Sequence, residues 1–226
     1  MTKRKLLGLV AVGVVLGLAS VVPSYAAPIQ VGDTIALSGS TGRLNWIGGA
    51  FLVTGPSTAF DTFCLEVNEY ISLNGSQFTV SDISINAILG GSVGLPGDPI
   101  SIETQYLYHK YATGGFAGAP PGSGTFQQDL QNAIWNLEGE GGVNNYLVAE
   151  ATGAIKLSDY GVRVMNLVAP GTDPANYYNL SKDGNGKYVY QRQSMLIFVP
   201  EPGSLLLLGS GLLGLAIAAR RKKSRG

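Results

Sequence analysis

Two apolar segments with basic residues beside them stand at the ends of this 226-residue chain, and they limit how much of it can fold as a globular domain. The first runs from Leu6 to Val22, after Lys3-Arg4-Lys5 and before Pro23-Ser24-Tyr25-Ala26-Ala27. A basic start, an apolar run and small residues before a cut after Ala26 predict a secretory signal peptide over residues 1–26. A retained N-terminal membrane anchor is the alternative.

The second apolar segment covers 203–219, which is 17 residues without a charge, and Arg220-Arg221-Lys222-Lys223 follow it. This length is at the lower limit for a helix that spans a bilayer, and the basic residues favour a cytoplasmic end. The sequence therefore predicts a transmembrane helix at 203–219, a basic tail at 220–226 and a body outside the inner membrane. A permanent single-span anchor is also compatible with this length if the bilayer thins slightly.

The motif Val199, Pro200, Glu201 and Pro202, the leucine-rich span and the basic tail together resemble the PEP-CTERM sorting signal of Gram-negative bacteria. The resemblance implies recognition by an exosortase, a transpeptidase-like membrane protease, with processing near Glu201-Pro202. It also implies transient anchoring in the inner membrane and delivery to the cell surface or extracellular matrix. Proteins of this family are commonly linked to exopolysaccharide and biofilm.

The segment between the two ends is acidic. Residues 27–200 hold seven basic and fourteen acidic residues, a net charge near −7. Nucleic-acid binding depends largely on Lys and Arg that neutralise phosphates, so we expect no nucleic-acid partner. The length of 27–199 fits one globular domain.

The pattern of this domain predicts an α+β fold that is mainly β, with strands arranged as a β-sandwich or barrel and two inserted helices. Turn-forming glycines separate the strand-like stretches in the first half, and the apolar period changes in the middle. The expected strands are Gln30–Leu37, Phe51–Thr54, Gln77–Ile85, Tyr188–Tyr190 and Ser194–Val199, and the expected helices are about 102–112, capped by Ser101, and 126–138, opened by a capping box at Thr125.

Two of these segments carry candidate functional residues. Phe60–Tyr70 alternates Phe63, Leu65 and Val67 with polar residues, which predicts a half-buried strand with Cys64 on the opposite face. On the helix 126–138, Trp135 lies nearly opposite the apolar stripe. A tryptophan there predicts that this helix packs on two sides and partly encloses Gln131.

Several classes of chemistry find no support in the sequence. His109 is the single histidine and Cys64 the single cysteine, which excludes structural zinc and His-rich catalytic zinc, and we interpret His109 as structural. We expect no catalytic residue, no metal and no cofactor. Asp183-Gly184-Asn185 lacks the remaining ligands of a calcium loop. A glycosidase remains an alternative, because four glutamates could face each other across a groove: Glu66, Glu69, Glu138 and Glu140.

The lone cysteine is the most informative residue. An unpaired cysteine in an exported protein is a buried inert thiol, an intermolecular link or a reactive group. Phe63-Cys64 and the later Gln131-Asn132-Ala133-Ile134-Trp135 resemble the motifs of thioester domains in bacterial surface adhesins, with Leu130 where threonine is usual. The resemblance covers about residues 60–138 and implies an internal thioester between Cys64 and Gln131.

Such a thioester implies covalent attachment. The Cys64 thiolate would displace ammonia from Gln131, and an amine or hydroxyl on a neighbouring protein or polysaccharide would then take the acyl group. Phe63 and Trp135 are expected to keep water away. An inert Cys64/Gln131 pair is the alternative; the protein would then be a structural matrix component that binds polysaccharide through exposed tyrosines such as Tyr177, Tyr178, Tyr188 and Tyr190. A secreted glycoside hydrolase is the third hypothesis.

Overall fold

The computed structural model describes residues 29–39, 50–67, 69, 71, 76–88, 97–116, 124–154, 157–179, 181–186, 188–199, 211 and 214. Ala27–Pro200 forms one compact unit. Three predicted segments lie outside the described residues: the signal peptide, the basic tail, and the transmembrane segment apart from its positions 211 and 214. Among the residues that are described, no helix has the length and apolar character needed to cross a membrane.

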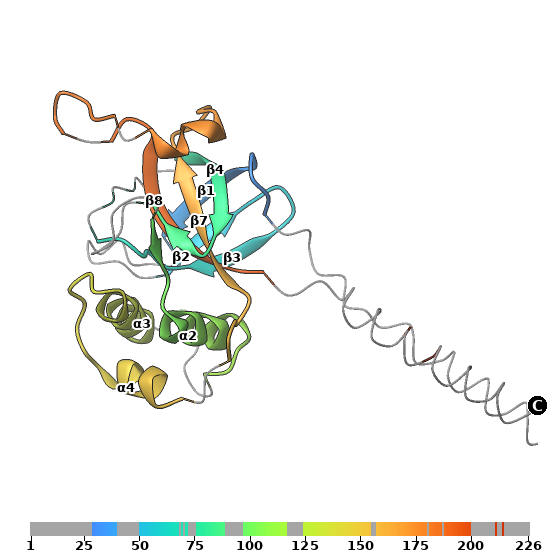
Figure 1. Cartoon of the computed structure of the whole chain (residues 1–226), viewed down its shortest axis with the longest axis vertical. Helices are drawn as coiled ribbons and strands as arrows, with labels where there is room; N and C mark the ends of the chain where they lie inside the picture. The colour runs from blue at the N-terminus through green and yellow to red at the C-terminus, as the bar shows by residue number, and fades with distance from the viewer. Residues whose placement is uncertain are drawn as a thin grey trace, which may run out of the picture. The chain divides into compact units, whose positions relative to one another are not determined.

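A six-stranded antiparallel sheet is the main element of the domain, with strand order β3-β2-β1-β4-β7-β8 (Figure 1). The predicted first strand begins four residues late, because Gln30 to Asp33 form a turn closed by the Asp33 N–H and the Gln30 carbonyl. Tyr188 makes only an isolated bridge with Lys182, so the predicted strand at 188–190 is wrong. The strands are β1 Thr34–Gly39, β2 Phe51–Thr54, β3 Ala59–Thr62, β4 Gln77–Ser84, β7 Val162–Val168 and β8 Gln191–Phe198, beside a short pair of β5 Asn86–Ala87 and β6 Asp98–Pro99.

The two edges of this sheet meet just beyond β3, where Cys64 forms an antiparallel bridge with Met195 of β8. Two backbone hydrogen bonds flank the bridge, from Leu65 N–H to the Ser194 carbonyl (3.0 Å) and from Leu196 N–H to the Phe63 carbonyl (3.2 Å). The sheet therefore closes into a barrel, an arrangement that removes exposed strand edges.

The segment after β3 differs from the predicted half-buried strand. Phe63, Cys64 and Leu65 are all buried, whereas Val67, expected on the apolar face, is 47% exposed. Alternation of polar and apolar residues is typical of a strand with one solvent-exposed face. Here one face of the segment packs against the helices and the other lines the barrel, so both faces are buried. The regular strand ends at Thr62.

Two apolar clusters form the core. One fills the barrel and includes Cys64, Trp135 and Met195. The other lies between the barrel wall and the helices and includes Phe63 and Leu196. Because neighbouring residues of a strand point to opposite faces, Met195 and Leu196 belong to different clusters.

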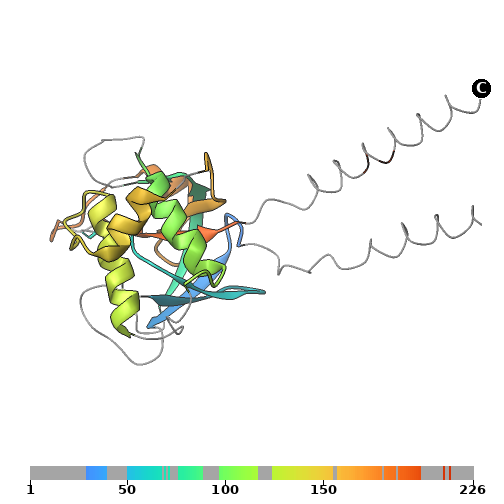
Figure 2. The same ribbon diagram turned by 90° about the horizontal axis from the view of Figure 1, so that it is seen from below.

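Three helices pack together on one side of the sheet (Figures 1 and 2): α2 Ile102–Ala112, α3 Gly124–Leu137 and α4 Tyr146–Gly153. Ser101 caps α2 as predicted. The capping box at Thr125 is wrong, since α3 begins at Gly124. The predicted pair of helices omitted α4, which Asn145 caps, because eight residues give too little apolar periodicity to recognise.

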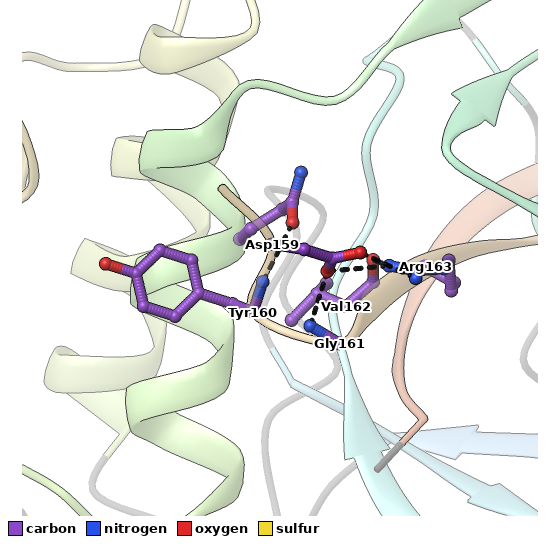
Figure 3. A network of polar contacts seen from close by, with 6 residues as sticks. Asp159, Tyr160, Gly161, Val162 and Arg163 are labelled. Atoms are coloured by element: carbon purple, nitrogen blue, oxygen red, sulfur yellow. Dashed lines mark hydrogen bonds and ion pairs between the residues drawn. The ribbon is translucent and has the colours of Figure 1, made fainter. Parts of the chain in front are cut away.

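The turn that leads into β7 joins the helices to the sheet (Figure 3). Arg163 makes two hydrogen bonds to the Asp159 carboxylate, at 2.8 and 3.0 Å, and the Gly161 N–H donates to it at 2.6 Å. The Tyr160 N–H donates to Gln105 of α2 at 3.4 Å. The first residues of β7 are thereby connected to the helical layer.

Candidate functional site

Gln131 of α3 lies against the backbone of Cys64. Its Oε1 accepts a hydrogen bond from the Cys64 N–H at 3.0 Å, and its Nε2 donates to the Cys64 carbonyl at 2.7 Å. Phe63 and Leu65 direct their backbone groups to β8, so the backbone groups of Cys64 point to the other edge of the segment. The carboxamide of Gln131 takes the position that a neighbouring strand would occupy.

Both members of this pair are buried. Gln131 has no exposed surface and Cys64 is 4% exposed. Helix α3 packs on two sides, as predicted: Leu130 and Ile134 belong to the cluster near the helices, whereas Trp135 shares the barrel cluster with Cys64. A buried carboxamide needs hydrogen-bond partners, and the Cys64 backbone supplies one for each end of the amide.

The two aromatic residues expected around the thiol lie in different places. Trp135 is 8% exposed and belongs to the same cluster as Cys64. Phe63 is fully buried, but its ring packs edge-on against Tyr108 and Tyr111 of α2, in the other cluster. Of these two residues, Trp135 is thus the one that shares an apolar cluster with the thiol.

The Cys64 thiol is held in its neutral form. Burial raises its pKa well above the usual range, and the negative charge of Glu69 raises it further. The thiolate is the nucleophilic form of cysteine, so a reaction of this thiol requires a group that accepts its proton.

Three of the four glutamates singled out in the sequence interact with one another, and the charge of one of them, Glu69, acts on Cys64. Glu66, Glu69 and Glu140 act electrostatically on one another, and Glu66 also forms a side-chain hydrogen bond with Glu140. Burial, then the charges of Glu69 and Glu140, raise the pKa of Glu66. Burial is also the main reason why the pKa of Glu69 rises to about 8, against the opposing effect of its hydrogen bonds with Ser194. Asp98 of β6, which the sequence did not indicate, adds its charge to this carboxyl cluster.

The fourth glutamate has a different environment. Glu138 accepts hydrogen bonds from the Ser101 hydroxyl at 2.6 Å and from the Ser101 N–H at 3.2 Å, and so fixes the start of α2. A glycosidase needs two carboxyl groups on opposite sides of a bound sugar. Glu66 and Glu140 instead contact each other, which disfavours that hypothesis.

Other candidates have structural surroundings. His109 packs against the rings of Tyr160 and Phe198, with centroids 5.5 and 5.2 Å away. The Asp183 carboxylate accepts the Asn185 N–H at 2.8 Å. Among the described residues, no three His, Cys, Asp or Glu side chains are placed to hold a metal ion.

The tyrosines considered for sugar binding are only partly described. Tyr188 and Tyr190 are partly exposed, and the Lys182 ammonium lies 4.6 Å from the centre of the Tyr188 ring. The side chains of Tyr177 and Tyr178 lie outside the described part of the chain.

The C-terminal segment matches a known family model. The match is to the PEP-CTERM protein-sorting motif, at residues 198–222. The protein therefore carries the signal of an exported protein that an exosortase, a membrane protease, sorts and processes. Of the predicted sorting motif, Val199 is described and donates its N–H to the Gly161 carbonyl at 2.8 Å, while Pro200, Glu201 and Pro202 lie outside the described residues. Comparisons with curated proteins and with solved structures found no match.

Proposed function

We propose that this exported protein acts at the cell surface or in the extracellular matrix and attaches there covalently, through a thioester between Cys64 and Gln131. The observation that supports the proposal is the pair of hydrogen bonds that hold the Gln131 carboxamide against Cys64 in a buried site. The protein is not an enzyme in this proposal, since each molecule reacts once with its surface.

The reaction balances without a cofactor. The Cys64 thiol loses its proton, and Sγ bonds to the carboxamide carbon of Gln131. The C–N bond then breaks and ammonia leaves with the proton. A primary amine of a surface protein, or a hydroxyl of a polysaccharide, later displaces Sγ and forms an amide or ester, which restores the thiol.

One of the two hydrogen bonds suits this chemistry directly. Negative charge develops on Oε1 of Gln131 when a nucleophile adds to the carboxamide carbon. The Cys64 N–H already donates to that oxygen at 3.0 Å, within the range expected for an oxyanion donor. The low polarity around Trp135 and Met195 would strengthen this bond and slow hydrolysis.

A second function is favoured by the same contacts. Both ends of the Gln131 amide are satisfied, and the thiol is neutral and buried, which is also the environment of an inert structural pair. The protein would then be a matrix component that binds polysaccharide without a covalent bond, through tyrosines such as Tyr188 and Tyr190.

Intact mass of the full chain, purified in detergent near neutral pH, separates the two functions. A thioester gives a mass lower by one ammonia than the sequence requires, and methylamine converts it to the methylamide. Cys64→Ala and Gln131→Ala must both lack the deficit, whereas Gln127→Ala, one turn earlier on α3, must keep it. An unchanged wild-type mass that methylamine leaves unaltered overturns covalent attachment and favours the inert pair.

A further inference from the structure

The match to the sorting motif begins inside the folded domain. It covers residues 198–222, whereas β8 ends only at Phe198, and Val199 still bonds to the turn before β7. Phe198 and Val199 therefore belong both to the barrel and to the signal that the exosortase processes. The last residues of the fold and the first residues of the signal are the same two residues.

Several contacts hold these two residues in the domain. Phe198 is the register partner of Val162 in β7, and its ring packs edge-on against His109 of α2, with centroids 5.2 Å apart. The Val199 N–H donates to the Gly161 carbonyl at 2.8 Å, and the Val199 side chain packs against the barrel cluster. The end of β8 is thus held by both the barrel and the helices.

The turn that receives Val199 is itself fixed (Figure 3). The Asp159 carboxylate accepts the Gly161 N–H at 2.6 Å and two hydrogen bonds from Arg163. Gly161 has a φ of +68°, which favours glycine, and a Cβ there would lie 2.9 Å from the Val199 carbonyl oxygen. The two backbone segments approach closely at this point, and the turn provides a preformed acceptor for the Val199 N–H.

The motif offers few backbone groups to a protease. Proline has no N–H, so Val199 and Glu201 hold the only backbone donors in the four residues Val199-Pro200-Glu201-Pro202. An extended peptide is commonly bound through backbone hydrogen bonds, as when it adds a strand to a sheet. In the folded domain the first of these two donors already bonds to Gly161. The barrel and a protease groove therefore compete for the same N–H.

The length of chain adds a steric limit. Glu201 lies two residues after Val199, and an extended chain covers at most about 3.6 Å per residue. While Val199 stays bonded, a cut near Glu201-Pro202 must occur within about 11 Å of that residue. A protease that encloses several residues on each side of the cut would collide with the domain unless the end of β8 separates from it.

We propose that the end of β8 is a latch, and that the exosortase takes the sorting motif only after Phe198 and Val199 have separated from His109 and the Gly161 turn. The end of a strand opens locally at low free-energy cost, so the rest of the barrel stays folded. Processing is then limited by the opening of the latch. This inference goes beyond covalent attachment and is independent of the Cys64–Gln131 thioester.

The test measures processing of full-length variants in cells that carry the exosortase. Pulse-labelled protein is followed by mass until the C-terminal segment is lost, which gives a rate for each variant. The first variant carries the insertion Gly-Ser-Gly-Ser-Phe-Val between Val199 and Pro200. It leaves the latch intact and gives the motif a second Phe-Val that lies outside the barrel.

The second variant, Gly161→Ala, loosens the latch itself, because its Cβ displaces the Val199 carbonyl. Gly171→Ala is the matched control. Gly171 also has a positive φ, +70°, but a Cβ there meets nothing within 4 Å. Any difference between the two alanine variants therefore comes from the contact with Val199 and not from backbone strain.

We expect the insertion variant to be processed about 10-fold faster than wild type, a ratio that corresponds to about 1.4 kcal/mol of opening free energy. Gly161→Ala should also be faster, whereas Gly171→Ala should keep the wild-type rate. Amide hydrogen exchange of the purified proteins checks the cause. The Val199 amide should exchange faster in Gly161→Ala than in wild type, while the amides of β7 stay protected.

Each outcome bears on the latch. Equal rates in wild type, the insertion variant and Gly161→Ala overturn it. Slower processing of the insertion variant also overturns it, because the exosortase would then need the barrel beside the motif. If Gly161→Ala does not fold, the insertion variant alone decides.

Two further outcomes concern the processing reaction. An insertion variant that is processed when wild type is not supports the latch in its strongest form, whereas loss of processing in both overturns it. None of these rates depends on reactivity with methylamine, so a failure of the thioester leaves the result unaffected.

Discussion

The side chain of Gln131 makes with Cys64 the pair of hydrogen bonds that one strand makes with the next. The amide oxygen accepts the Cys64 N–H at 3.0 Å, and the amide nitrogen donates to the Cys64 carbonyl at 2.7 Å. Without this side chain, two backbone groups of a fully packed segment would lose their partners. With its amide intact, Gln131 therefore contributes to stability through both hydrogen bonds.

Gln131→Ala should lower the free energy of unfolding by about 3 kcal/mol, because it leaves two backbone groups unpaired in the core and creates a cavity. Gln127→Ala, one turn earlier on the same helix, removes a single hydrogen bond to the Tyr111 hydroxyl and should cost about 1 kcal/mol. Denaturant unfolding of both variants measures the difference. Equal losses would contradict a special role of the Gln131 contacts.

Stability should fall as the pH rises from about 5 to about 9. Unfolded glutamates ionise at about pH 4.3, whereas the pKa values of folded Glu66 and Glu69 are raised. The folded state therefore binds more protons than the unfolded state in this range. The stabilisation that comes from these two carboxyl groups is fully present below the unfolded pKa. It is lost as the pH rises through the folded pKa, which is about 8 for Glu69.

The melting temperature measured in steps of pH checks this dependence. Glu66→Gln, which cannot ionise, should flatten the curve, and Asp183→Asn in an exposed turn should leave it as in wild type. A melting temperature that rises between pH 5 and pH 9 would show that the buried carboxyl groups are not the dominant titrating residues.

Gly142 should tolerate no side chain. A Cβ atom there would lie 2.1 Å from the Asn132 carbonyl oxygen and 2.6 Å from the Asn136 nitrogen, both backbone atoms of α3. Gly142→Ala should cost about 3 kcal/mol, the upper end for overpacking, and should displace the turn that carries Glu140. Gly153→Ala is the matched control, because a Cβ there meets nothing within 4 Å, and thermal unfolding should show it unchanged or slightly stabilised.

The sorting motif gives a further prediction. Replacing Pro200, Glu201 and Pro202 with alanine should stop processing, so that the chain stays in the membrane fraction at its unprocessed mass. Mass spectrometry of the membrane and secreted fractions makes the measurement, with Asp183→Asn as a control for export. Normal release of the triple variant would indicate that the recognised feature lies elsewhere in residues 198–222.

Elements with strong local signals were predictable from the sequence. Strand β2 has the predicted limits, and α2 begins at the predicted cap, because turn glycines and a capping serine define their ends locally. Strand β7 was not predicted. Nearly all of its residues are buried. It therefore lacks the alternation of polar and apolar residues that identifies a strand with one solvent-exposed face.

The site was predictable only in part, for a similar reason. Cys64 and Gln131 were linked through a family resemblance, since 66 residues lie between them and no local pattern joins them. The contact of Glu69 with Ser194 and the charge of Asp98 near Glu66 depend on barrel closure and on the pairing of β5 with β6. Such contacts arise from long-range strand pairing, which a single sequence does not specify.

The bridge between Cys64 and Met195 also determines how the domain would bear tension. The chain leaves the barrel from the end of β8, so a pull on the sorted C-terminal side enters along that strand. If the surface bond forms at Gln131, the load passes from β8 to the segment around Cys64 and then to α3. The two hydrogen bonds that flank the bridge lie across the direction of pull, and they share the force with the longer pairing of β8 with β7.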